Sequence, residues 1–294
     1  MRTSRGIAVI SLIFITSCSA TKVAAQKGGM SADESSSLLT RHAPYSLPLD
    51  AYAISPDQQR VIGKAQNIEI KRCMARLGLS YAPAKEESAG AYKYVNYRRY
   101  GLVDAAAAKQ IGYHLPSNPI EQKKSASLSP EQKVGLAGVL AGGPQSIHGH
   151  KVPDGGCMGE MNRNFRKKFS APKAADVAQK ISAESYRDSL KRDPVKEAFS
   201  DWSHCMAGEG FSFADPIEAL QSAKLDDPIV SSREKMIAQS DVMCKSKTRL
   251  IERWSTEESI IQTQMIERNK ASLVLLISMH NKLIAAAEKI NGGS

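Results

Sequence analysis

The side chains best suited to covalent chemistry in this chain are its five cysteines, and the first of them stands in a recognisable setting. Cys18 follows Ile15, Thr16 and Ser17, and an apolar stretch precedes these residues. An aliphatic residue, two small residues and a cysteine form the bacterial lipobox, in which the thiol is alkylated by diacylglycerol. We therefore expect residues 1–17 to be a lipoprotein signal peptide and Cys18 to carry a lipid that anchors the protein to the cell membrane.

The same segment also permits an ordinary secretory signal. Small residues at the required spacing would allow cleavage after Ala20 or after Ala25, and the protein would then be secreted without a lipid. The apolar stretch at residues 7–15 is shorter than the about 20 residues that span a bilayer. Both interpretations place the mature chain outside the cytoplasm.

The four remaining cysteines are expected to form two disulfide bonds. An even number of cysteines in an oxidising compartment is typical of a disulfide framework, and four cysteines allow three pairings that sequence alone does not decide. We favour Cys73–Cys157 and Cys205–Cys244, because an internal repeat described below would then be bridged within each half. A four-cysteine metal site is disfavoured, because no two of these residues have the C-x₂-C or C-x₄-C spacing.

Other residues give weaker indications of a site. His148 and His150 could chelate a metal from an extended loop, but no third ligand accompanies them, so we predict no metal site. The chain contains no nucleophile elbow, P-loop, HExxH helix or haem-attachment motif, and we assign no catalytic residue. Four tyrosines could line a groove for a sugar or a peptide, or could form a packing layer; they are Tyr92, Tyr94, Tyr97 and Tyr100.

The chain is basic, with a formal net charge of +10. Outside the cytoplasm such a surface favours anionic partners, so we consider membrane lipid, a wall polymer or another envelope protein. The densest basic cluster would spread around a helix, which is typical of a solvated face; its members are Arg163, Arg166, Lys167, Lys168 and Lys173. We expect no nucleic-acid partner, because no aromatic platform is interleaved with these charges, and we expect no cofactor.

Composition and local signals favour an all-α fold, because aromatic residues are few and good helix formers are common. Residues 18–52 show no periodicity and are predicted to be a flexible tether. Capping boxes at Ser55–Gln58 and Ser129–Gln132 predict helix starts. A third capping box, at Ser255–Glu258, predicts one long C-terminal helix. Its apolar stripe follows helical spacing through Ile261, Met265, Leu273, Leu276, Met279, Leu283, Ala287 and Ile290.

The most informative feature of the mature chain is an internal repeat. The pattern C-M-A-x-x-G-[LF]-S-[YF]-A occurs at residues 73–82 and again at residues 205–214. Glycine five residues after the cysteine is expected to take the left-handed C-cap conformation, with the next apolar residue folding back over the last turn. A second cysteine follows in each half. We therefore predict two lobes, residues 53–192 and residues 193–294, each with its own disulfide.

These motifs also suggest a family. Their order along the chain resembles that in a family of secreted proteins and lipoproteins from actinomycetes. The motifs are the repeated Cys-Met-Ala segment, Arg99-Tyr100-Gly101-Leu102, Gly112-Tyr113, Asp154-Gly155-Gly156-Cys157, Asp193-Pro194, Trp202-Ser203-x-Cys205 and Ala238-x-x-Asp241-x-x-Cys244. The resemblance covers most of residues 55–280. Because the family has no assigned activity, it implies compartment and architecture only.

The function that these features favour is a membrane-tethered extracytoplasmic lipoprotein that acts as a non-catalytic binding or structural module of the cell envelope. Two alternatives stay open. A cell-wall hydrolase would need converging carboxylates in a cleft. A metal- or small-molecule-binding lipoprotein would need a completed ligand set or a lined groove.

Overall fold

A computed structural model describes residues 45–82, 96, 98–115, 128–138 and 145–293. The expected signal peptide, Cys18, Ala20 and Ala25 lie outside these residues. The fold is all-α, as the sequence predicted. Its longer helices are α2 (Pro56–Arg76), α7 (Pro172–Ser189), α8 (Asp193–Gly208), α10 (Ser232–Lys247), α11 (Leu250–Arg268) and α12 (Lys270–Gly292). The shorter elements are η1 (Pro48–Tyr52), α3 (Ala105–Ile111), α5 (Pro130–Ala137), β1 (Ser146–Ile147), β2 (His150–Lys151), α6 (Gly156–Met161), η3 (Asn162–Arg166), η4 (Lys167–Phe169) and α9 (Pro216–Gln221).

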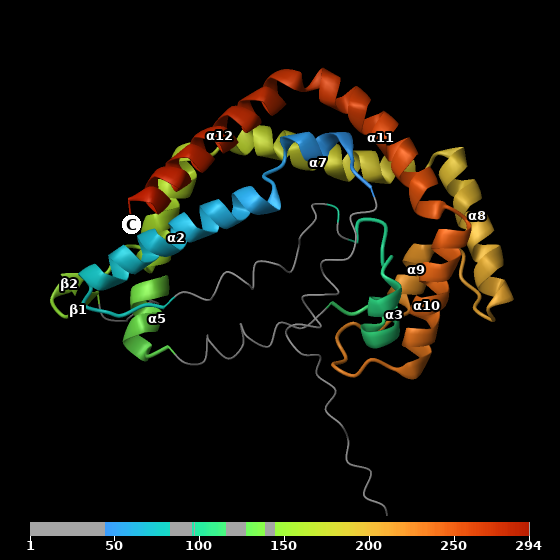
Figure 1. The fold of residues 1–294 in the computed structure, drawn as a ribbon, viewed down its shortest axis with the longest axis horizontal. Helices are drawn as coiled ribbons and strands as arrows, with labels where there is room; N and C mark the ends of the chain where they lie inside the picture. The colour runs from blue at the N-terminus through green and yellow to red at the C-terminus, as the bar shows by residue number, and fades with distance from the viewer. Residues whose placement is uncertain (1–44, 83–95, 97, 116–127, 139–144, 294) are drawn as a thin grey trace, which may run out of the picture.

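The helices form an arch (Figure 1). Helices α11 and α12 follow one another over its top, and α7 lies beneath them. One limb, which we call the α2 limb, holds α2, α5, α6 and the small antiparallel hairpin of β1 and β2. The other, which we call the α10 limb, holds α3, α8, α9 and α10.

Local sequence signals set several helix starts. At α2, the Ser55 hydroxyl accepts a hydrogen bond from the backbone N–H of Gln58 at 3.2 Å. The Gln58 side chain in turn accepts one from the Ser55 N–H at 2.8 Å. The predicted capping box at Ser129 and Gln132 has the same pair of bonds at the start of α5. These reciprocal bonds satisfy N–H groups that the first helical turn cannot pair internally.

The two copies of the repeat end their helices in the same way. Leu79 donates its N–H to the Met74 carbonyl at 3.0 Å, and Phe211 donates to the Met206 carbonyl at 3.0 Å. The intervening residues, Gly78 and Gly210, have φ of +70° and +83°. This is the Schellman motif that the repeat predicted, and it requires residues that tolerate a left-handed backbone.

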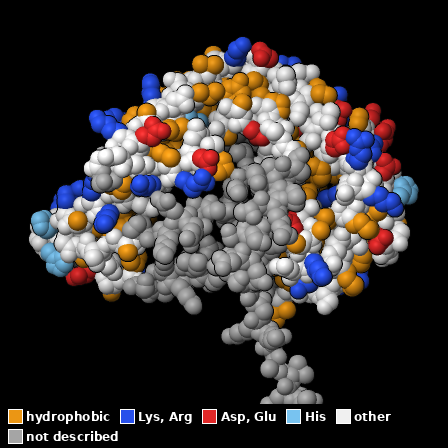
Figure 2. Space-filling view, viewed as in Figure 1, with side chains coloured by type: hydrophobic (Ala, Val, Ile, Leu, Met, Phe, Trp, Pro, Cys, Tyr) orange, Lys and Arg blue, Asp and Glu red, His pale blue; other side chains and the backbone are white. Residues whose placement is uncertain are grey.

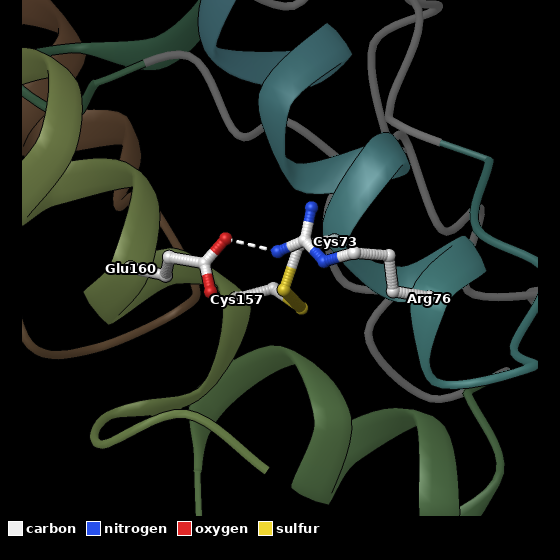
Figure 3. The surroundings of a disulfide bond; sticks show 4 residues. All are labelled: Cys73, Arg76, Cys157 and Glu160. Atoms are coloured by element: carbon white, nitrogen blue, oxygen red, sulfur yellow. Dashed lines mark hydrogen bonds and ion pairs between the residues drawn. A yellow bond between two sulfur atoms is a disulfide. The ribbon is translucent and has the colours of Figure 1, made fainter. Parts of the chain in front are cut away.

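The disulfides join Cys73 to Cys157 and Cys205 to Cys244, which is the pairing that the sequence favoured. Figure 3 shows the first bridge between α2 and α6, with an ion pair between Arg76 and Glu160 beside it. The ion pair lies one helical turn beyond the bridge on both helices, so the two contacts hold the same pair of elements. The sequence separations of 84 and 39 residues correspond to about 5 and about 4 kcal/mol in the chain-entropy treatment of cross-links.

The two disulfides lie in different limbs, but the limbs do not follow the boundary expected at residue 192. Leu102 and Tyr113 are buried in one cluster with Trp202 and Trp254, so residues 100–113 belong to the α10 limb. In the opposite direction, α12 returns to the α2 limb, because its buried residues share a cluster with Ile62 and Ala65 of α2. Each half of the sequence therefore contributes an element to the other half's limb.

The predicted tether extends too far into the folded part. Leu47 is only 2% exposed, and the N–H of Leu49 donates to the side chain of Gln262 at 3.0 Å. The 3₁₀ helix η1 thus packs on α11. Apolar burial and a long-range hydrogen bond explain why order begins before residue 53.

The expected single C-terminal helix is instead two helices. Residues Ser255–Glu258 lie inside α11, which begins at Leu250, so the predicted capping box is not used. α11 ends at Arg268, and the side-chain amide of its C-cap residue, Asn269, donates to the Met265 carbonyl at 2.8 Å and competes with continuation of the helix. The chain bends there at the top of the arch and continues as α12 (Figure 1).

α12 has a mean hydropathy of 1.2 over an 18-residue window, enough by length and composition to cross a membrane. Its Leu273 and Leu276, however, are buried in a cluster with Ile181 of α7, and Leu283 is buried against α2. The helix therefore packs within the arch. Figure 2 shows hydrophobic side chains near the top of the arch, where Val274 and Leu275 of α12 are more than half exposed.

Candidate functional site

The predicted tyrosine groove is wrong for Tyr100, its one member among the described residues. Tyr100 is 2% exposed, and its hydroxyl donates to a carboxylate oxygen of Glu258 at 2.7 Å. Its ring packs against Tyr45 and Trp254, each with ring centroids 4.8 Å apart. For this residue the alternative of a packing layer holds. Tyr92, Tyr94 and Tyr97 lie outside the described residues.

Tyr100 belongs to a buried polar cluster centred on Glu258, whose side chain is fully buried. The guanidinium of Arg99 forms an ion pair with this carboxylate, its Nε lying 3.0 Å from both oxygens. Ser185 and Gln262 donate to the same carboxylate at 2.9 Å each. These donors satisfy the charge and the lone pairs of the carboxylate. Because they come from residues 99–100, α7 and α11, the cluster holds these three segments together.

A second buried cluster in the α10 limb is centred on Asp241. Its carboxylate accepts hydrogen bonds from Lys245 at 2.8 Å, Trp202 at 3.0 Å and Tyr113 at 3.1 Å. The Lys245 ammonium also donates to the Leu102 carbonyl at 3.1 Å. Burial raises the pKa of the Asp241 carboxyl, and the three donors oppose that rise. Both buried clusters are saturated with internal partners and are best suited to positioning the helices.

A cavity of about 1030 Å³ lies beside the second cluster, where α10 turns into α11 and α3 begins. Apolar side chains from all three segments line it, namely Val103, Ala105, Val242, Met243 and Ile251. Lys245 lines it too, and its pairing with Asp241 fixes that wall. The polar lining consists of Tyr45, Lys109, Gln239, Ser246, Lys247, Arg249, Glu252 and Ser255.

The charges around this cavity are predominantly positive. Lys245 is neutralised by Asp241, and exposed Arg249 is paired with Glu252. Among the residues that the structure describes, exposed Lys109 and Lys247 have no ion-pair partner. Within the described residues, the cavity rim thus carries two uncompensated positive charges. Arg249 has a left-handed backbone with φ of +53°, an uncommon conformation for a residue other than glycine.

Two smaller cavities, of about 580 and 230 Å³, adjoin Arg99. Their shared lining includes Asn96, Gln179 and Ser182. None of the three cavities described is lined by more than one carboxylate. The largest has Glu252, the smallest has Asp50, and the third has none. The pair of carboxylates that a glycoside hydrolase requires is therefore not found in any of these three.

The histidine pair does not form a metal site in the described part of the chain. His148 has its Nδ1 3.0 Å from the Leu77 carbonyl, so that nitrogen carries the proton and caps the end of α2. His150 is exposed on β2, and Figure 2 shows histidine side chains at the surface on that end of the α2 limb. Within the described residues, no group of three potential ligands from His, Cys, Asp and Glu comes together.

The basic cluster is a solvated face, as expected. Its five members are all exposed along η3, η4 and the start of α7. Arg163 donates to the Asp154 carbonyl at 2.6 Å and so supports the loop before α6. The cluster lies away from the cavity, which is built from other helices.

Fold and cavity together define a disulfide-bridged all-α protein with an open, apolar-walled cavity and a cationic rim. Comparisons with models of protein families, with curated proteins and with solved structures found no match.

Neither buried cluster has a clear signal in the amino-acid sequence. Asp241 and Lys245 have the i, i+4 spacing of an ordinary surface pair, and Glu258 stands in an apparent capping box. A usable signal was the position of Asp241 three residues from both Ala238 and Cys244, which are fully buried. Residues three apart lie on the same face of a helix, so this spacing indicated that the Asp241 side chain faces the core.

Proposed function

We propose that this protein is an extracytoplasmic lipoprotein, anchored through Cys18, that acts as a non-catalytic binding module of the cell envelope. The cavity at the α10–α11 turn is the site where it would take its ligand. The single observation that carries this proposal is a cavity of about 1030 Å³ with apolar walls on a rigid frame. Such cavities are the usual form of small-molecule sites, which measure about 300–1,000 Å³.

The surroundings of the cavity support a binding role. The disulfide between Cys205 and Cys244 joins α8 to α10, and the Asp241 cluster fastens α10 to the chain before and after α3. A preorganised wall reduces the conformational entropy that a ligand must remove on binding. Two disulfides also agree with an oxidising compartment outside the cytoplasm.

Attachment is tested by replacing Cys18. The Cys18→Ala protein should leave the membrane fraction and appear in the soluble extracytoplasmic fraction, because the thiol that receives the lipid is gone. A double variant, Cys205→Ala with Cys244→Ala, is the control for the loss of cysteines other than Cys18. It should stay in the membrane fraction. Retention of Cys18→Ala in the membrane fraction would contradict the proposed anchor.

The binding role is tested with a fluorescent apolar probe, 1-anilinonaphthalene-8-sulfonate. The soluble domain should bind it in a saturable manner, and Met243→Glu should abolish that binding by placing a charge in the cavity wall. Met236→Glu is the matched control, because Met236 is similarly exposed on α10 but does not line the cavity.

A further inference from the structure

We propose that the cavity at the α10–α11 turn binds a single-chain anionic amphiphile, a molecule with one acyl chain and a negatively charged head group. This inference rests on the proposed binding function and specifies its ligand class. The occupant is a free monomer and not a membrane surface. The proposal is carried by the way apolar walls and unpaired cations are distributed around the cavity.

The apolar walls are shaped for a chain. Gln239, Val242, Met243 and Ser246 all line the cavity from α10, so the cavity follows that helix over eight residues. At the rise of an α-helix this corresponds to about 10 Å. Val103 and Ala105 form the facing side, before and at the start of α3. The cavity is therefore elongated along α10, and its apolar side chains, among them Val103, Val242 and Met243, can contact an alkyl chain between more polar ends.

The direction of α3 locates the charges. The Leu102 carbonyl meets Lys245, whereas the Tyr113 N–H donates to Glu234, so α3 runs antiparallel to α10. Lys109 therefore lies toward the Gln239 end of the cavity, and Lys247 lies at the opposite end near the turn. The two uncompensated cations stand at different ends of the apolar wall.

The turn between α10 and α11 is the better place for an anionic head group. Lys247 has no ion-pair partner among the described residues, and Arg249 stands two residues later. Arg249 is bound to Glu252, but both of their side chains are exposed, so a ligand anion can reorganise the pair at small energetic cost. A carboxylate or phosphate here would gain charge-assisted hydrogen bonds.

At the other end, Lys109 has a different role. Its four-carbon stem can cover the far part of the acyl chain while the ammonium stays in water. Lys109 thus adds apolar contact and a weaker electrostatic attraction. The geometry assigns the head group to Lys247, the tail to Val242 and Met243, and the far end of the tail to the stem of Lys109.

The experiment measures binding of monomeric lipids to the soluble domain with both disulfides formed, by isothermal titration calorimetry below the critical micelle concentration. Oleate and oleoyl-lysophosphatidylglycerol supply carboxylate and phosphate head groups on one chain, and monoolein supplies the same chain without charge. The variants are Lys247→Glu for the head group and Met243→Glu for the tail. Their matched controls are Lys64→Glu on exposed α2 surface and Met236→Glu on the same helix.

We expect one-to-one binding of at least one anionic lipid, with monoolein about tenfold weaker, since one strengthened ion pair is worth about that factor. Lys247→Glu should remove this preference, and Met243→Glu should remove binding of all three lipids. Lys64→Glu and Met236→Glu should bind as the original protein does. If only one of the two anionic lipids binds, that result supports the proposal and defines its head group.

Other outcomes overturn the inference. Equal binding of monoolein and oleate would refute the anionic head group while the cavity remained a binding site. Equal weakening by Lys64→Glu would show that attraction is nonspecific. Binding to phosphatidylglycerol vesicles without binding to any monomer would assign the surface to membranes. If neither these lipids nor the fluorescent probe binds, the proposed binding function fails as well.

Discussion

Replacing Glu258 by alanine tests whether the buried cluster beneath the arch stabilises the fold. The carboxylate is fully buried, and Arg99, which pairs with it, is only 16% exposed. Removal would leave that guanidinium with Ser182 and without a counter-charge, and it would free the hydroxyl of Tyr100 and the amide of Gln262. Losing one partner of a buried ion pair costs about 3–5 kcal/mol.

The neighbouring residue provides the control. Glu257 pairs with Arg192, whose side chain is half exposed and returns to water when the pair is broken, so Glu257→Ala should cost about 1 kcal/mol or less. Urea unfolding followed by circular dichroism measures both free energies. A domain of this size should lose about 2–4 °C in melting temperature per kcal/mol, so Glu258→Ala should lose at least about 6 °C. Equal losses of unfolding free energy in the two variants would refute the argument that burial makes the Glu258 ion pair more stabilising than the Glu257 ion pair.

Two further predictions concern a glycine pair and alkaline pH. Gly78→Ala and Gly210→Ala should each lower the free energy of unfolding by about 1–2 kcal/mol, because alanine is strained at positive φ. Gly78→Ala should lower it by about 1 kcal/mol more, because the new Cβ would stand 2.9 Å from Nδ1 of His148. Urea unfolding of the pair measures the difference, and equal costs would contradict it. Burial raises the pKa of Tyr45 from 10.0 to about 12. Because the folded state holds this proton more tightly, its contribution to stability is complete below pH 10 and is lost as the pH rises toward 12. Urea midpoints that stay constant from pH 10 to pH 12 would contradict that sign.

Elements governed by neighbouring residues were predictable from the sequence. The Ser55 and Ser129 caps, the glycine-ended repeat and the helical class all depend on contacts within a few residues, and the structure confirms them. The disulfide pairing followed because the repeat limited an otherwise open choice. These features share short sequence separation or internal symmetry.

Features that depend on tertiary packing were not predictable. Ser255 and Thr256 bond back to the Glu252 carbonyl inside α11, although their sequence imitates a helix start. Glu258, which stands at the N3 position of the apparent capping box, instead meets Arg99, which is 159 residues away. The cavity was missed for the same reason, because its walls come from three segments whose proximity no local pattern records.

The return of α12 to α2 has a consequence for the order of folding. The Asn291 side chain donates to the Val61 carbonyl across 230 residues, and Ile62 shares its cluster with Leu283 and Ala287. Contacts of such separation require closure of a long loop, which slows folding. During synthesis, α2 emerges well before the helix that covers it. Its apolar face stays without that cover until nearly the whole chain has been made, and such transiently exposed apolar surface favours aggregation.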